Sequence, residues 1–134
     1  MKTLAVGLFG ICGAMLRYLI GLWAQDWWAS PFPFGTLTAN FLGCLFLGWF
    51  SGWAASIPNM PAWLRLGIGT GFVGAFTTFS ALSMESVTLV QDGQLGVALL
   101  YVLISLFGGL ALAWIGHGIS RRYARRPAKG DEPR

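Results

Sequence analysis

Charged side chains are scarce in this chain of 134 residues, of which only 10% are Asp, Glu, Lys or Arg. Soluble domains carry roughly 25%, so the composition excludes an ordinary water-soluble fold. Cysteine and histidine are also rare: Cys12 and Cys44 have no metal-ligand spacing, and His117 alone cannot complete a zinc site. We interpret the cysteines as small packing residues. The sequence has no nucleophile–base pair and no acid pair, so we expect that the protein is not an enzyme.

Apolar residues make up 55% of the chain and come in four long blocks rather than in alternating or amphipathic patterns. The mean hydropathy is +0.63. The blocks cover residues 3–24, 35–55, 63–90 and 95–118. About 20 apolar residues cross the hydrocarbon core as a helix, and a segment in lipid must satisfy its own backbone hydrogen bonds. The sequence therefore predicts an all-α membrane protein, with one four-helix transmembrane domain at 1–118 and a basic polar tail at 119–134.

The basic residues are distributed very unevenly along this predicted topology. With four spans, the N-terminus, the second loop and the C-terminus share one side of the membrane, and that side holds eight of the nine basic residues. The first and third loops hold only Asp26 and Asp92 as charged residues. The positive-inside rule therefore places both termini in the cytoplasm. We expect the basic tail to contact anionic membrane lipid rather than nucleic acid.

Glycine is abundant, with 19 residues, and much of it recurs at helical spacings. Small residues on one face let helix backbones approach closely in lipid, where no hydrophobic force drives their association. We therefore predict a tightly packed bundle. The spaced glycines are Gly7, Gly10 and Gly13, Gly48 and Gly52, and Gly67 and Gly71.

A polar stretch interrupts the third apolar block near its middle. Residues 70–80 read TGFVGAFTTFS, in which threonines, a serine and glycines weaken a helix. One interpretation is a helix broken at 74–80, whose free backbone is buried in protein or lines a cavity. The other is a helix that is merely kinked, with hydroxyls bonded to carbonyls one turn earlier. The residues alone leave both interpretations open.

Isolated polar residues occur inside the other blocks, and buried polar groups in a membrane are candidates for function. Arg17 and Glu85 can form a structural ion pair or serve a pathway. Asn40 has no obvious charged partner, and Tyr101 and Ser105 share one face of the fourth helix. The predicted interior is thus rich in neutral hydrogen-bond donors and poor in carboxylates. That balance suits a small anion that must shed water and then leave again.

Three segments, taken in order, resemble the signature segments of a known family. They read GAMLRY at 13–18, PFGTLTANFLG at 33–43 and TGFVGAFTTFSALSMES at 70–86. In sequence and spacing they resemble the Fluc/CrcB fluoride channels. The resemblance implies a four-helix protein of the bacterial cytoplasmic (inner) membrane that assembles as a dimer, often with oppositely oriented subunits. Such a dimer would passively export fluoride and so lower its concentration in the cytosol.

The resemblance also implies roles for particular residues. The backbone carbonyls of Gly74 and Thr77 would coordinate a central structural sodium ion that is not transported, and oxygen ligands suit such a hard cation. Asn40 would supply an amide to the fluoride pathway, and Arg17 would lie near a vestibule. Independently of the resemblance, we predict that Thr78 and Glu85 are structural polar residues. The remaining pathway residues would be Phe79 as an aromatic lining residue, and Thr38, Ser80, Tyr101 and Ser105 as polar wall residues.

Two positions depart from the family pattern. Leu82 stands where a second phenylalanine is usual, and Gly109 stands where a serine is common. One reading is a pore with a different lining in a homodimer. The other is a heterodimer with an oppositely oriented sister chain, which the strong charge bias favours because an antiparallel homodimer needs little orientation preference.

Two other functions fit four apolar helices. A small-molecule or multidrug transporter of this size would need a carboxylate in the first helix, and residues 3–24 contain none. A membrane scaffold that transports nothing would use its glycines for packing and its basic tail for lipid. The scaffold predicts that replacing Asn40 or Thr77 changes stability alone.

Overall fold

The computed structural model describes residues 1–27 and 32–124 and is all-helical in those ranges, apart from short connections. Four of its helical segments are long and apolar enough to cross a membrane, which confirms the predicted four-span fold. The third span is built from several pieces in succession. The elements are α1 (Lys2–Trp27), α2 (Phe34–Ala55), α3 (Ala62–Leu66), η1 (Gly67–Val73), α4 (Gly74–Phe76), α5 (Phe79–Gln91) and α6 (Leu95–Ala124).

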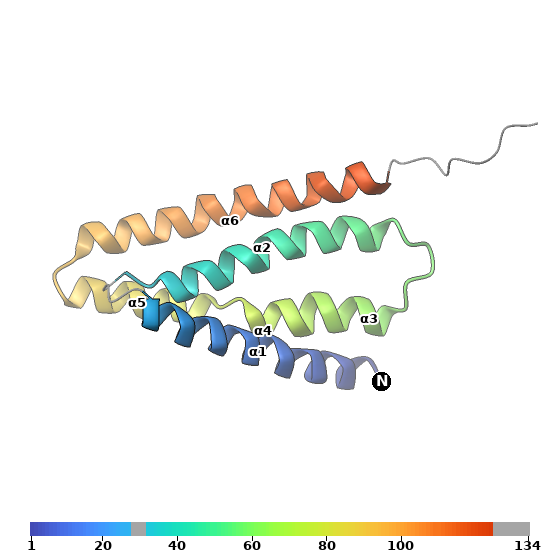
Figure 1. Ribbon diagram of the computed structural model, residues 1–134, viewed down its shortest axis with the longest axis horizontal. Helices are drawn as coiled ribbons and strands as arrows, with labels where there is room; N and C mark the ends of the chain where they lie inside the picture. The colour runs from blue at the N-terminus through green and yellow to red at the C-terminus, as the bar shows by residue number, and fades with distance from the viewer. Residues whose placement is uncertain (28–31, 125–134) are drawn as a thin grey trace, which may run out of the picture.

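Successive spans run in opposite directions, so α2 and α6, which lie side by side, run parallel to each other (Figure 1). The start of α1, the connection from α2 to α3 and the last turns of α6 lie at one end of the molecule, as the predicted topology requires. The last helix continues past residue 118 to Ala124. The first residues of the predicted polar tail are therefore helical, and the helix does not end at the predicted domain boundary. Residues 125–134 lie outside the described part of the chain.

Glycines bring α2 and α6 into direct backbone contact. A Cβ atom added at Gly48 would overlap the backbone carbonyl of Ala113, and one added at Gly116 would overlap the carbonyl of Leu45. The two contacts are reciprocal, because each helix presents a glycine to the backbone of the other. The predicted close packing of small residues is therefore found at this interface.

The same arrangement holds α1 against η1. A Cβ atom at Gly13 would overlap the carbonyl of Phe72, and one at Gly71 would lie within 2.5 Å of the carbonyl of Val6. Gly7 differs from the other spaced glycines, since nothing lies within 4 Å of its added Cβ. Our interpretation of Gly7 as a packing glycine was therefore wrong within the protomer. The π-helical geometry of Gly67–Val73 was not predicted.

Candidate functional site

The third span is broken at two residues. Helix α4 ends at Phe76, and Thr77 (ψ 152°) and Thr78 (φ −146°, ψ 121°) are both extended before α5 begins at Phe79. The hydroxyl of Thr77 does donate to the carbonyl of Val73, 3.0 Å away and one turn earlier. The backbone nevertheless leaves the helix immediately afterwards. The structure therefore has the predicted break and not merely a kink.

The side-chain amide of Asn40 bonds to the backbone at the break. The backbone amide of Thr78 donates to Oδ1 of Asn40 at 2.8 Å, and Nδ2 of Asn40 donates to the carbonyl of Thr78 at 3.1 Å. Asn40 thus pairs with Thr78 as a neighbouring strand would. A carboxamide nitrogen carries two hydrogens, so one N–H of Asn40 remains for another acceptor. The sequence drew attention to Asn40 but not to this partner.

The hydroxyl of Thr78 starts the following helix. It accepts a hydrogen bond from the backbone amide of Ala81 at 3.2 Å, as an N-cap residue does. It also lies 3.1 Å from the hydroxyl of Ser80. The side chain of Thr78 is buried, which fits its predicted structural role, whereas Ser80 is exposed in the single protomer.

The carbonyls of Gly74 and Thr77 are among those that lose their helical donors at the break. In an uninterrupted α-helix the carbonyl of residue i accepts from the amide of residue i+4. For Gly74 that amide belongs to Thr78, which donates to Asn40 instead, and for Thr77 it belongs to Ala81, which donates to the Thr78 hydroxyl. Gly74 is exposed, with nothing within 4 Å of an added Cβ. These are the two carbonyls on which the sequence resemblance places a cation.

The carboxylate of Glu85 is held by two hydroxyls from different helices. Thr36 on α2 donates to Oε1 at 2.6 Å, and Tyr101 on α6 donates to Oε2 at 2.7 Å. Tyr101 is fully buried. In the described residues Glu85 forms no ion pair with Arg17, so the ion-pair interpretation of these two residues is wrong. The position of Glu85 inside a span gave a signal that partners must exist, but their identity depends on how three helices meet.

The other predicted pathway residues differ in their surroundings. The hydroxyl of Ser105 is buried and has no hydrogen-bond partner among the described residues. The ring of Phe79 is 80% exposed. Thr38 and Arg17 are half-buried. Gly74, Phe79 and Ser80 are therefore all exposed at the break in the single protomer.

Both departures from the family pattern lie at packing contacts. Leu82 is half-buried against a cluster that contains Leu37 and Tyr101. Gly109 is buried, and a Cβ added there would lie 3.3 Å from the sulfur of Cys44. Leu82 therefore contributes to the core between α2, α5 and α6, and Gly109 contributes to the contact between α6 and α2.

Comparison with known proteins places this geometry in context. Residues 4–117 match the family model described as CrcB-like protein, Camphor Resistance (CrcB). A protein of Geobacillus kaustophilus named fluoride-specific ion channel FluC 2 is 43% identical over 121 residues, covering 90% of this chain and 94% of its own. A FluC 2 protein of Listeria innocua is 41% identical, covering 96% and 97% of the two chains. A FluC 1 protein of Desulfitobacterium hafniense is 47% identical, covering 81% and 94%.

Proposed function

This chain belongs to the CrcB family, and from that premise we propose that it is a channel that conducts fluoride across the bacterial cytoplasmic membrane. The relatives compared above carry the name of fluoride-specific ion channels rather than of enzymes. The observation that carries the proposal is the broken third span with Asn40 held against it. Flux through the channel is passive, so fluoride leaves the cell down its electrochemical gradient.

Neutral donors at the break and on α6 support an anion as the transported ion. Asn40 keeps one N–H beyond the one bonded to Thr78. The buried hydroxyl of Ser105 has no partner among the described residues, and the hydroxyl of Ser80 is exposed beside the break. An anion can exchange water for such donors and then leave again. A fixed positive charge would instead favour permanent binding of the anion.

The exposed residues at the break support assembly with a second subunit. Backbone without helical partners is tolerated at membrane depth only when protein covers it or it lines a cavity. Gly74 is exposed in the single protomer, and so are Ser80 and the ring of Phe79. A second copy, oppositely oriented, covers these residues and brings two equivalent breaks together.

The carbonyls of Gly74 and Thr77 would hold a sodium ion where the two breaks meet. Sodium is a hard cation that takes oxygen ligands, and two subunits would supply two carbonyls each. Among the described residues there is no group of three or more His, Cys, Asp and Glu side chains that would compete for a metal. When bound, the ion would neutralise the clustered carbonyl dipoles and tie the subunits together.

Reconstitution of the purified chain alone in liposomes tests the function. Liposomes loaded with fluoride should release fluoride, followed with a fluoride electrode, once a potassium ionophore removes the charge barrier. Liposomes loaded with chloride should not release chloride under the same conditions. A folded dimer without flux would refute the homomeric channel, and recovery of flux on adding an oppositely oriented sister chain would establish the heterodimer.

Replacing sodium tests the cation site separately from the flux. Exchange of sodium for N-methylglucamine should lower the melting temperature of the dimer and slow fluoride efflux. An unchanged melting temperature would contradict a structural ion at Gly74 and Thr77. The sodium-dependent shift should be absent for monomeric protein, because one subunit supplies only half of the ligands.

A further inference from the structure

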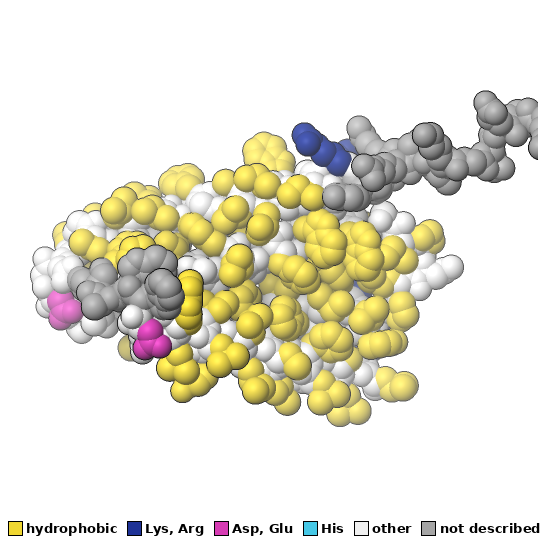
Figure 2. All heavy atoms as spheres, in the orientation of Figure 1, with side chains coloured by type: hydrophobic (Ala, Val, Ile, Leu, Met, Phe, Trp, Pro, Cys, Tyr) yellow, Lys and Arg dark blue, Asp and Glu magenta, His cyan; other side chains and the backbone are white. Residues whose placement is uncertain are grey.

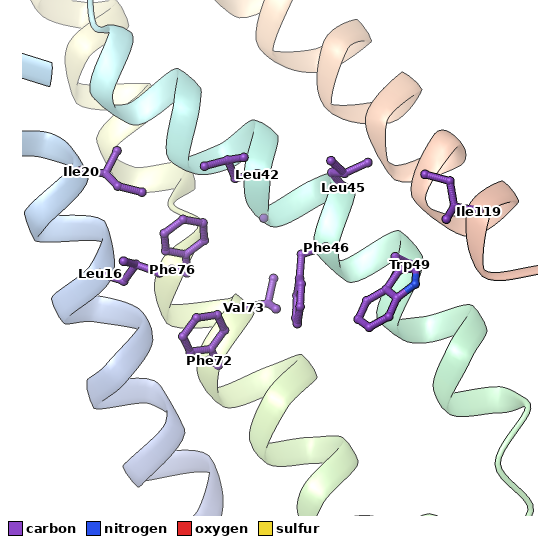
Figure 3. Close-up of a pocket in the computed structure, with 11 residues that line it drawn as sticks. Leu16, Ile20, Leu42, Leu45, Phe46, Trp49, Phe72, Val73, Phe76 and Ile119 are labelled. Carbon is purple, nitrogen blue, oxygen red and sulfur yellow. The ribbon is translucent and has the colours of Figure 1, made fainter. Parts of the chain in front are cut away.

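An apolar groove of about 650 Å³ runs between α1, α2, the broken span and α6. Figure 3 shows side chains from these helices directed toward one space, among them Leu16 from α1, Phe46 from α2 and Phe76 from α4. None of the 11 lining residues is charged. The volume lies within the ~300–1,000 Å³ range of small-molecule sites in proteins. In a membrane, a groove of this kind takes an apolar occupant.

The groove lies on the side of α4 that faces away from Gly74. Phe76, which lines the groove, follows Gly74 by two residues in α4, and at ~100° per residue the two point in nearly opposite directions. The second subunit that we propose at Gly74 therefore leaves the groove to lipid. This step rests on the proposed dimer.

One end of the groove is suited to a lipid headgroup. Trp49 lines the groove and stacks on Trp53, with ring centroids 5.6 Å apart and an interplanar angle of 7°. Tryptophans favour the depth of the headgroups. Ile119 lines the same region, and Arg122 follows it by three residues, so the two share one face of α6.

Charge also distinguishes this end from the other. Arg122 is exposed, and so is Arg121, which lies on a different face of the same helical turn from Ile119. Figure 2 shows the basic side chains at this end of α6 and the acidic side chains at the opposite end of the molecule. Anionic headgroups are attracted to arginines placed at the membrane surface.

We propose that the groove binds an acyl chain of an anionic phospholipid, whose phosphate is held by Arg122. Apolar burial along Phe46 and Phe76 provides the chain site, and the arginine selects the headgroup. A dimer has two such grooves, and in an oppositely oriented pair they open toward opposite leaflets. Each arginine near a membrane surface favours anionic over neutral lipid by about fivefold.

Native mass spectrometry of the purified dimer tests this site. The probes are phosphatidylglycerol and phosphatidylcholine with identical acyl chains, supplied in equal amounts. The wild-type dimer should retain up to two lipids and prefer phosphatidylglycerol. Arg122→Gln should lower that preference about fivefold. Arg121→Gln, which removes the same charge one residue away, should lower it much less.

Filling the groove tests the acyl-chain site. Leu42→Trp should remove the retained lipid, because Leu42 lines the groove and is 47% exposed, so that a larger side chain is accommodated. Leu16→Trp, from the α1 side and at a residue 40% exposed, should do the same. Leu47→Trp is the matched control, since Leu47 lies on α2, is 39% exposed and does not line the groove.

Three results would overturn the proposal. Equal retention of the two lipids by the wild type would remove the headgroup site. Equal effects of Arg121→Gln and Arg122→Gln would mean that the basic charge attracts anionic lipid in general and that Arg122 does not form a specific headgroup site. Full lipid retention by both groove variants would remove the acyl-chain site. The same spectra report the dimer mass, so failure of the proposed assembly is seen separately from loss of lipid.

Discussion

Replacing Asn40 by aspartate tests whether this side chain lies on the fluoride pathway. The change keeps the size of the side chain and keeps the oxygen that accepts from the amide of Thr78 at 2.8 Å. It removes the N–H that donates to the carbonyl of Thr78 at 3.1 Å and the second N–H that remains for an anion. A negative charge then stands where a neutral donor stood.

The effect on flux should greatly exceed the effect on stability. Loss of one buried hydrogen bond that leaves a carbonyl unpaired costs ~1–3 kcal/mol. Repulsion between two unit charges about 4 Å apart amounts to ~4 kcal/mol at an effective dielectric constant of about 20. That repulsion corresponds to a roughly thousandfold lower occupancy by fluoride. We therefore expect efflux close to the background of empty liposomes from a protein that still folds.

The assay is fluoride efflux from proteoliposomes, with the melting temperature and dimer fraction measured on the same preparation. Asn59→Asp is the matched control, because Asn59 lies exposed in the connection between α2 and α3 and the change adds the same charge. It should conduct like the wild type. Asn40→Asp protein that conducts at the wild-type rate would refute the placement of Asn40 on the pathway. A lower melting temperature with unchanged flux would mean that Asn40 stabilises the break but does not contact fluoride.

Three further changes test the packing and the polar contacts. Gly48→Leu forces a side chain against the backbone of α6 and should lower the free energy of unfolding by ~1–3 kcal/mol, measured by thermal unfolding. Gly118→Ala is the control, because nothing lies within 4 Å of an added Cβ there. It should leave the free energy of unfolding unchanged or raise it by up to ~1 kcal/mol. Tyr101→Phe removes the 2.7 Å bond to Glu85 and should cost ~1–3 kcal/mol of stability and slow efflux; lower stability with unaltered efflux would contradict a place for this hydroxyl on the pathway. Gly109→Ser brings a Cβ 3.3 Å from a cysteine sulfur on α2, so it should lower the melting temperature without raising flux; higher flux would show that the missing hydroxyl limits conduction.

The membrane-spanning architecture was predictable because it depends on properties that a sequence carries directly. Length and apolarity set the four spans, and their bounds agree with the observed helices to within a few residues, apart from the extension of α6 to Ala124. The break at Thr77 and Thr78 was one of two open interpretations. Threonine hydroxyls can also donate to the carbonyl one turn earlier in a helix that is only kinked. The hydroxyl of Thr77 makes this bond, to the carbonyl of Val73, even in the broken span.

The partners of the polar residues were not predictable in the same way. Glu85 was expected to form a structural ion pair with Arg17 or to serve a pathway, but its oxygens bond to Thr36 and Tyr101. That choice depends on the rotation and depth of α2, α5 and α6 relative to one another, and glycine contacts between backbones determine the packing of α2 against α6. Hydropathy and spacing do not predict how far each helix is rotated about its axis. A sequence therefore identifies the buried polar residues but not their hydrogen-bond partners.

The broken span shows how a side chain can free a carbonyl while the amide that would have bonded to it keeps another partner. A helix that simply ends inside a membrane leaves both amides and carbonyls without partners, at a cost of several kcal/mol for each group. Here Oδ1 of Asn40 and the hydroxyl of Thr78 take up the amides of Thr78 and Ala81. The carbonyls of Gly74 and Thr77 are thereby released from their helical donors while these two amides stay bonded. Removing the acceptor at Asn40 would let the amide of Thr78 return to Gly74, so the same side chain that offers an N–H to fluoride also keeps the proposed cation site open.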